Sequence, residues 1–156
     1  MKIGCVIYPD WSLCGIKEDP CTPEIKAVIK EVWPEPVDFE IHTMPNNQVE
    51  IENLLCYLAD YGHCGLILTA GGTGPSSKDI TPEATKMVIE KELPGFGEAM
   101  RSVTSQKVPT VIISRATAGT RGRSLILNLP GNPKSIRESL LHLVPVIREV
   151  LRQLSD

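Results

Sequence analysis

The fold of this chain is decided by one stretch of sequence, Gly65-Leu66-Ile67-Leu68-Thr69-Ala70-Gly71-Gly72-Thr73-Gly74-Pro75-Ser76-Ser77-Lys78-Asp79-Ile80-Thr81-Pro82-Glu83. It begins with an uncharged apolar run, which predicts a short buried strand. It ends with the signals of a helix start: Thr81 as N-cap, Pro82 at the first helical position and acidic Glu83. A glycine-rich loop therefore leaves a strand and enters a helix, and in open α/β sheets ligands bind at such places.

The loop itself has the composition of an anion-binding turn. Three glycines, Gly71, Gly72 and Gly74, let a ligand approach the main chain, whose N–H groups can bind a phosphate. Lys78 adds positive charge, and Asp79 is the one carboxylate. A shared Mg²⁺ ion is the simplest reason for a carboxylate beside phosphates. The alternative is a plain Gly/Ser turn in which Asp79 caps the next helix, because the stretch matches neither GxxxxGK[ST] nor GxGxxG.

Length and charge bound the class of protein. The chain has 156 residues, of which 42% are hydrophobic, so we expect one compact domain over residues 1–156. Sixteen Lys and Arg against nineteen Asp and Glu give a net charge of −3, which offers no support for nucleic-acid binding. No apolar run is long enough to cross a membrane, and the N-terminus lacks the layout of a signal peptide. We therefore expect a cytoplasmic protein.

The cysteines agree with that compartment. Five cysteines, an odd number with no CxxC pair, predict free thiols. Cys5, Cys56 and Cys64 lie in or beside apolar segments and are expected to be small core residues. Cys14 and Cys21 fall in a predicted loop without ligand-spaced partners, so a metal site there is the weaker reading.

Hydrophobic periodicity predicts strands that alternate with helices. The predicted strands are residues 2–8, 37–44, 65–68, 110–114 and 124–129. The predicted helices are residues 22–32, 48–61, 82–91, 98–105 and 133–154, with a hairpin or flap at 115–123 and a kink at Pro145. This alternation indicates an α/β fold with three layers, an open and mostly parallel sheet with helices on both faces, plus the small hairpin or flap.

A second turn also leads from a strand into a helix, and it reads Pro130-Gly131-Asn132-Pro133-Lys134-Ser135. In a parallel sheet the carboxyl ends of the strands meet at one edge. The two turns are therefore expected to form two walls of one crevice. A plain helix cap is the alternative for the second turn, since Pro and Ser are common at helix starts.

Several motifs of this chain resemble those of a known family, the molybdenum-cofactor biosynthesis proteins. The chain is most similar to the molybdopterin adenylyltransferase branch, the relatives of MogA and the gephyrin G domain, with related domains in MoaB-like proteins. The match is dense over residues 65–138 and weaker before them. The motifs are Gly71-Gly72-Thr73-Gly74 with Asp79-Ile80-Thr81-Pro82-Glu83-Ala84-Thr85, Pro94-Gly95-Phe96-Gly97-Glu98-Ala99-Met100-Arg101, Ile113-Ser114-Arg115, and Leu127-Asn128-Leu129-Pro130-Gly131-Asn132-Pro133-Lys134-Ser135.

The resemblance implies an activity: molybdopterin and Mg-ATP react to adenylyl-molybdopterin and pyrophosphate. It implies that Asp79 holds Mg²⁺ and acts in catalysis together with the residue at position 46, here Asn46. It also implies a homotrimer, and a downstream protein that inserts molybdate. The residues implied to bind the nucleotide or the pterin are Gly71, Gly72, Thr73, Gly74, Ser114, Pro130, Gly131, Asn132, Lys134 and Ser135.

Two departures from the family pattern keep a second function open. The turn after the second strand usually reads Pro-Asp, whereas this chain has Pro45-Asn46, and an asparagine supplies no negative charge. The first loop keeps Asp10, Gly15 and Asp19, but its usual Ser and Arg are replaced. The alternative to an active enzyme is thus a catalytically weak molybdopterin-binding or carrier protein. Asp10 or Asp19 could restore the charge if the first loop folds over the site.

Overall fold

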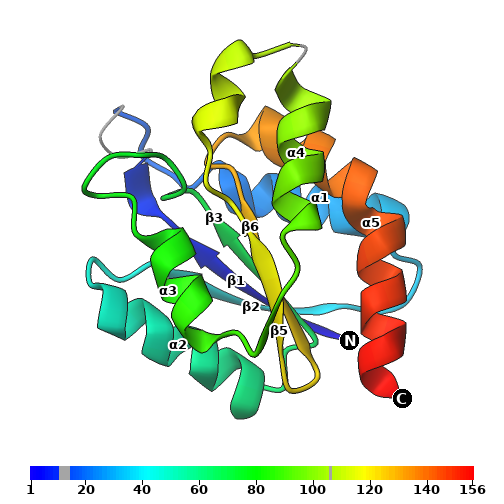
Figure 1. Cartoon of the computed structure of the whole chain (residues 1–156). Helices are drawn as coiled ribbons and strands as arrows, with labels where there is room; N and C mark the ends of the chain where they lie inside the picture. Colours follow the sequence, from blue (N-terminus) through cyan, green and yellow to red (C-terminus); the bar gives the residue numbers. More distant parts are fainter. Residues whose placement is uncertain (11–14, 106) are drawn as a thin grey trace.

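The structure is a computed structural model that describes residues 1–10, 15–105 and 107–156. These residues form strands and helices in alternation (Figure 1). The strands are β1 (Lys2–Ile7), β2 (Asp38–Thr43), β3 (Leu66–Ala70), β4 (Lys91–Glu92), β5 (Ala118–Arg121) and β6 (Ser124–Leu129). The helices are α1 (Cys21–Val32), α2 (Gln48–Asp60), α3 (Thr81–Val88), α4 (Gly95–Ser105), the 3₁₀ helix η2 (Pro109–Ile113) and α5 (Pro133–Ser155).

The strands form one mixed sheet in the order β2-β1-β3-β6-β5-β4. The pairings of β1 with β2, β1 with β3 and β3 with β6 are parallel, as expected. The last two strands are antiparallel, because β5 and β6 form a hairpin and β4 extends it. The chain runs from β1 outward to β2 and then places β3 on the other side of β1. This reversal of strand order is the topological switch point at which open α/β sheets bind ligands.

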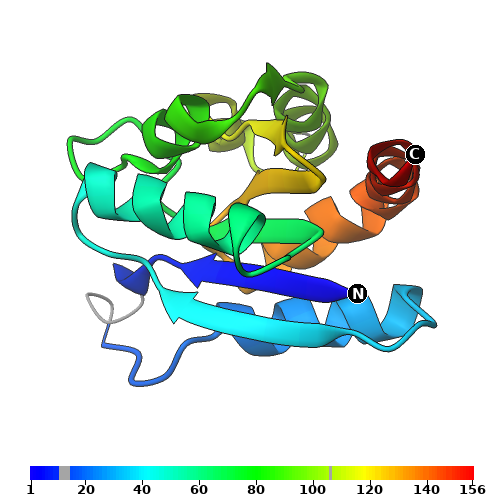
Figure 2. The same cartoon turned by 90° about the horizontal axis from the view of Figure 1, so that it is seen from below.

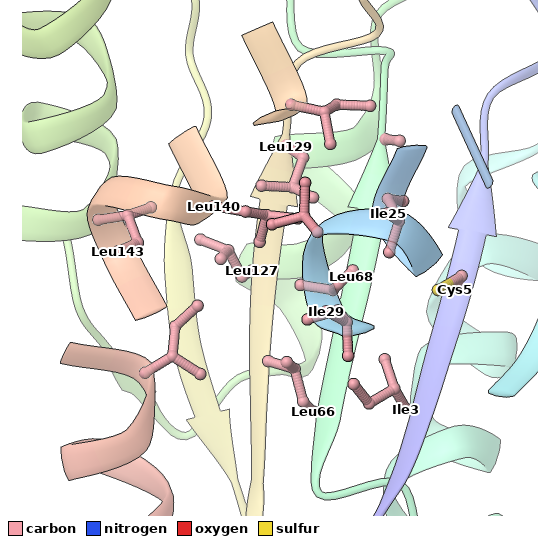
Figure 3. Close-up of a cluster of buried hydrophobic side chains, with 14 of the residues drawn as sticks. Ile3, Cys5, Ile25, Ile29, Leu66, Leu68, Leu127, Leu129, Leu140 and Leu143 are labelled. Atoms are coloured by element: carbon pink, nitrogen blue, oxygen red, sulfur yellow. The ribbon is translucent and has the colours of Figure 1, made fainter. Parts of the chain in front are cut away.

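Helices cover both faces of the sheet, so the three-layer prediction is confirmed (Figure 2). Alternate residues of each central strand point to opposite faces. One face packs against α1, α4 and α5, and Figure 3 shows Ile3, Leu66 and Leu127 with Ile25 of α1 and Leu140 of α5 in that layer. The other face packs Val6, Ile67 and Ile126 against α2 and α3. Both layers bury their apolar side chains, which is the main favourable contribution to folding.

The predicted strand at residues 110–114 is wrong. The segment forms η2 instead, and Ile112 and Ile113 are 70% and 55% exposed. A short apolar run cannot be assigned to a strand by periodicity alone. Here β6 takes its neighbours from β3 and β5, so no sheet edge remains at this position for another strand.

Several helix ends also differ from the sequence prediction. Thr81 is the first residue of α3 and not its N-cap, which is Ile80. The predicted helix at 82–91 ends at Val88, because Lys91 and Glu92 pair with β5. The fourth helix begins at Gly95 rather than at residue 98. α5 carries Pro145 in its interior, and Figure 1 shows it changing direction between its orange and red parts, as a proline inside a helix leads one to expect.

The cysteines are mostly where the sequence places them. Cys5 and Cys64 are buried and Cys56 is half-buried, and these thiols are free. Cys21 does not lie in a loop as predicted: it is the buried first residue of α1. Cys14 falls outside the described residues. No helix in the described ranges combines the length and the apolar character that spanning a bilayer requires.

Candidate functional site

The glycine loop begins at the switch point of the sheet and needs its glycines. Gly71 and Gly72 have φ angles of 90° and 68°, which residues with a side chain rarely adopt. A β-carbon on Gly71 would lie 2.9 Å from Tyr8 Cβ, and one on Gly72 would lie 2.3 Å from Thr81 Oγ1. The hydroxyl of Thr81 donates to Gly71 O over 3.0 Å. The loop is therefore held between β1 on one side and the start of α3 on the other.

The two predicted turns do meet. Gly71 N donates to Leu129 O at the end of β6, over 3.0 Å. A β-carbon on Gly131 would come within 3.2 Å of Gly71 Cα and 3.5 Å of Asp10 Oδ2. Cys21 donates its thiol to Gly131 O over 3.4 Å. The glycine loop, the Pro-Gly turn and Asp10 thus lie together at the carboxyl edge of the parallel strands.

Asp79 closes the glycine loop on itself. Its Oδ2 accepts hydrogen bonds from Ser76 N at 3.1 Å and Ser76 Oγ at 2.5 Å, and Asp79 N donates to Ser76 O at 3.1 Å. The alternative in which Asp79 caps the next helix is not observed, since the N-cap position of α3 has no side-chain hydrogen bond. Asp79 is partly buried, while Ser76 and Lys78 are exposed. The carboxylate is therefore held in one place at an open surface.

A pocket of about 370 Å³ lies on the β1 and β2 side of this loop. Its lining combines apolar and polar side chains from three strand ends. Burial raises the pKa of Tyr8 above its usual value, and the negative charges of Asp79 and Asp10 add to that increase. The lining residues are Tyr8, Pro9, Asp10, Met44, Pro45, Asn46 and Lys78.

A second pocket of about 370 Å³ lies on the other side of α3. Ser114 lines this pocket and not the first one, together with Thr117 and the charged side chains of Glu83 and Arg101. Arg101 fixes the main chain around it by donating from Nη1 to Ser114 O at 3.1 Å and Ala116 O at 3.0 Å. Of the predicted site residues, Asn46 thus lines the first pocket and Ser114 the second.

The Pro-Gly turn serves partly as the helix cap that the sequence left open. The side chain of Asn132 accepts from Lys134 N at 2.9 Å and Ser135 N at 3.3 Å, which caps α5. Lys134 is exposed and Pro130 and Ser135 are partly exposed at the same edge. Asn132 therefore offers its backbone and not its capping oxygen to a ligand, and Lys134 can place a positive charge there.

The first loop contributes unequally. Asp19 uses its carboxylate at the start of α1, where Oδ1 accepts from Cys21 N at 2.7 Å and Thr22 N at 3.2 Å. Asp10 lines the first pocket beside Asn46. Of the two carboxylates that the sequence offered as substitutes for a charge at position 46, Asp10 is the one at the site. Trp11 falls outside the described residues.

Two arginines of the segment 115–123, which the sequence predicted as a hairpin or flap, bind other parts of the protein. Arg121 binds Asp60, with Nη2 2.7 Å from Oδ2, and its hydrogen bonds hold the pKa of that carboxyl below its usual value. Arg115 turns to the glycine loop, where Nε donates to Gly74 O at 2.9 Å and Nη2 to Asp79 O at 2.8 Å. Arg123 is exposed on the hairpin turn. The motif Ile113-Ser114-Arg115 was the sequence signal for Arg115, and its contacts with the glycine loop were not predicted from it.

Sequence reasoning also missed a buried polar hub. Asn128 of β6 is fully buried, and its Nδ2 donates to Thr69 Oγ1 at 3.0 Å and Thr85 Oγ1 at 2.9 Å. Its Oδ1 accepts from Thr117 N at 3.2 Å. One amide thus joins the strand before the glycine loop, α3 behind it and the segment that follows Ser114. The sequence signals for it were a polar residue in an otherwise apolar strand and its place in the motif that begins at Leu127.

The donor set fits a magnesium ion that is carried largely by its substrate. Ser76 donates both of its hydrogen bonds to Asp79 Oδ2. Within the described ranges no residue donates to Oδ1, so this oxygen can bind a metal ion. Those ranges contain no group of three or more His, Cys, Asp or Glu side chains placed to hold a metal. Mg²⁺ in nucleotide sites commonly uses one or two carboxylates, with phosphates and waters as the other ligands. Asp79 and Asp10, with the Asn46 carbonyl, have that chemistry.

The fold and site define an α/β protein with a glycine-rich loop at the switch point of its sheet, and comparison with known proteins identifies the family. A family model described as a probable molybdopterin binding domain matches residues 15–149. The chain is 46% identical over 147 residues to a molybdopterin adenylyltransferase of Helicobacter pylori, covering 94% of this chain and 84% of that protein. It is 45% identical over 140 residues to the Haemophilus influenzae protein of the same name, covering 90% and 71%.

A solved structure agrees with this result. The molybdopterin biosynthesis enzyme MoaB of Thermus thermophilus superimposes with a TM-score of 0.84 at 38% identity, covering 98% of this chain and 95% of that one. The chain therefore belongs to the molybdopterin-binding domain family of molybdenum-cofactor biosynthesis proteins. The family resemblance of the sequence motifs is confirmed.

Proposed function

We propose that this protein is a molybdopterin adenylyltransferase. It transfers the adenylyl group of ATP to molybdopterin and releases pyrophosphate. One observation carries the proposal: a chain about half identical to enzymes of that name places its glycine loop and Asp79 at the switch point of the sheet, between two pockets of about 370 Å³ each. A transfer between two substrates requires that both be held side by side in the right orientation.

The reaction asks little of the protein except position and charge. An oxygen of the pterin phosphate attacks the α-phosphorus of ATP, and the bond to the β-phosphate oxygen breaks, so that pyrophosphate leaves with the electron pair. The amides of Gly71, Gly72 and Gly74 with the Thr73 hydroxyl are proposed to bind the phosphates. Lys134 is proposed to balance the charge of the pterin phosphate. No covalent intermediate with the protein is required.

Asp79 is proposed to hold the Mg²⁺ that accompanies ATP. When bound, that ion neutralises phosphate charge and orients the α-phosphate. Asn46 lines the first pocket and can offer its side-chain carbonyl oxygen to the ion. Asp10, which lines the same pocket, supplies a negative charge. Ser114 and the Pro130, Gly131, Asn132 and Ser135 turn are proposed to bind the pterin side.

Pyrophosphate release with purified protein, freshly prepared molybdopterin, ATP and Mg²⁺ tests the proposal. Asp79→Asn keeps the size of the side chain and its ability to accept from Ser76, while removing its charge. We expect turnover by the parent protein and a loss of about 100-fold or more in Asp79→Asn, the scale seen when one electrostatic group is removed from an active site. Equal turnover in both proteins would contradict the role of Asp79, and none in either would contradict the activity.

Asn46 favours a second candidate, a molybdopterin-binding or carrier protein with little catalysis. Asn46→Asp separates the two functions, since it restores a second charge in the first pocket. A large increase in rate would identify a weakened enzyme. An unchanged and measurable rate would show that Asp10 already supplies what the site needs. Tight binding of molybdopterin without turnover in either form would support the carrier.

Assembly and location are part of the same proposal. We propose a homotrimer, because exposed apolar side chains such as Val108, Ile112, Leu141 and Val146 are suited to subunit contacts. A cytoplasmic location fits the free thiols of the described cysteines. A downstream protein that inserts molybdate is the proposed consumer of the product. Sedimentation or light scattering measures the trimer directly.

A further inference from the structure

One arginine ties the glycine loop to the segment that carries Ser114. Arg115 N donates to Thr73 O at 2.8 Å. Its side chain donates from Nε to Gly74 O at 2.9 Å and from Nη2 to Asp79 O at 2.8 Å. The third guanidinium nitrogen, Nη1, forms an ion pair with Glu83 at the start of α3. Each guanidinium nitrogen thus has a different partner. The two carbonyl acceptors, Gly74 O and Asp79 O, lie on either side of the exposed residues 75–78 of the loop.

The ion pair is not the main part of this arrangement. The side chains of Arg115 and Glu83 are 38% and 42% exposed, and exposed pairs of this kind contribute little to stability. The carbonyl contacts differ because they are directional and fix the main chain of Gly74 and Asp79. Only a planar guanidinium presents several donors in a rigid fork, and a lysine has a single nitrogen on a flexible stem.

From this geometry we propose that Arg115 is a positioning residue, which holds the Asp79 carboxylate in place and couples the two pockets. The catalytic consequence of this role rests on the proposed function, whereas the positioning of the loop by Arg115 does not. Ser114 and Arg115 both line the second pocket, so a ligand bound there is placed to order the guanidinium. The guanidinium in turn orders the loop that borders the first pocket. A small shift of the guanidinium is therefore enough to couple the position of Asp79 to that of Ser114.

The structural part is tested by amide hydrogen exchange, which needs no substrate. The amides of Ser76 and Asp79 are bonded inside the loop, and their protection depends on the loop keeping its shape. We expect Arg115→Lys to raise their exchange rates at least fivefold. The amide of Trp33, bonded to Ile29 O at the end of α1, lies outside both pockets, serves as the internal reference and should not change. Arg123→Lys, an exposed arginine on the hairpin, is the matched control.

Kinetics test the catalytic part. We expect Arg115→Lys to lower kcat at least tenfold while the KM for molybdopterin changes less than threefold, because the loop is misplaced rather than the pterin lost. Glu83→Gln removes the charge of the ion pair but leaves the carbonyl contacts, so the exchange rates of the Ser76 and Asp79 amides should stay within threefold of the parent. Arg115→Gln, which keeps one N–H group as donor, provides a second variant if Arg115→Lys does not fold.

The outcomes separate this proposal from the proposed function. Unchanged exchange at Ser76 and Asp79 in folded Arg115→Lys or Arg115→Gln would overturn the positioning role. Faster exchange with unchanged kcat would overturn its catalytic consequence. If the parent protein releases no pyrophosphate, the adenylyltransferase proposal fails, and the exchange experiment still decides whether Arg115 holds the loop. Exchange at Ser76 and Asp79 that is as fast in Glu83→Gln as in Arg115→Lys would assign the effect to the ion pair instead.

Discussion

Replacing Asn128 of the central strand β6 should destabilise the fold. Its amide makes three hydrogen bonds with Thr69, Thr85 and Thr117, and Asn128, Thr69 and Thr85 are fully buried. Asn128→Leu keeps a similar volume and removes all three. A typical net contribution of about 1 kcal/mol per hydrogen bond gives a loss of about 3 kcal/mol in the free energy of unfolding, and the buried N–H of Thr117 is left without its acceptor. For a chain of this size, that corresponds to a fall in Tm of about 6–12 °C.

Urea unfolding followed by circular dichroism measures this change directly. The midpoint should fall while the slope stays constant, because the surface exposed on unfolding is unchanged. Asn46→Ala is the matched control: Asn46 is exposed, so its replacement should change the unfolding free energy by less than about 0.5 kcal/mol. A loss below about 1 kcal/mol in Asn128→Leu would refute the reasoning, since it would mean that the three partners find other bonds at little cost.

Three further changes test other parts of the structure. Gly72→Ala places a β-carbon 2.3 Å from Thr81 Oγ1 at a φ of 68°, so we expect a loss of about 2–4 kcal/mol by thermal unfolding, whereas Gly122→Ala, with open space around it, should lose only about 1 kcal/mol. Asn132→Ala removes the cap of α5 and should cost about 1 kcal/mol in the same measurement, and no change would show that the cap is unimportant. Burial raises the pKa of the Cys5 thiol to about 12, from 9.0 for a free thiol. Below pH 9 the Cys5 thiol is protonated in both the folded and the unfolded chain. As the pH rises from 9 to 12 the thiol of the unfolded chain ionises first, so the unfolding free energy falls by up to about 1.4 kcal/mol per pH unit. Cys5→Ala should make that decline shallower when unfolding is measured across this pH range.

Local signals predicted the parts of the fold that depend on neighbouring residues. The apolar run 65–68, the glycines after it and the Pro-Glu start of a helix all lie within one stretch, and the structure arranges them as β3, a loop and α3. The two turns were expected at one edge because parallel strands end together, and the approach of Gly131 to Gly71 follows from that rule.

The remaining features depend on contacts between distant residues, and no local pattern encodes them. Residues 110–114 have the composition of a strand, but whether such a run joins a sheet is decided by which edge is free. Arg115 reads as an exposed hairpin charge until its partners, Gly74 and Asp79, are known. Thr81 reads as an N-cap, yet its hydroxyl bonds Gly71 across the loop because the glycine turn brings that carbonyl within reach.

Transfer of a labelled α-phosphate tests the proposed activity most directly. ATP labelled at the α-phosphorus is incubated with molybdopterin, Mg²⁺ and the parent protein, and both the pterin product and pyrophosphate are measured. The predicted result is label in the pterin in a one-to-one ratio with pyrophosphate, abolished by Asp79→Asn and by chelating the Mg²⁺. Pyrophosphate without labelled pterin, or bound molybdopterin without any transfer, would contradict an adenylyltransferase.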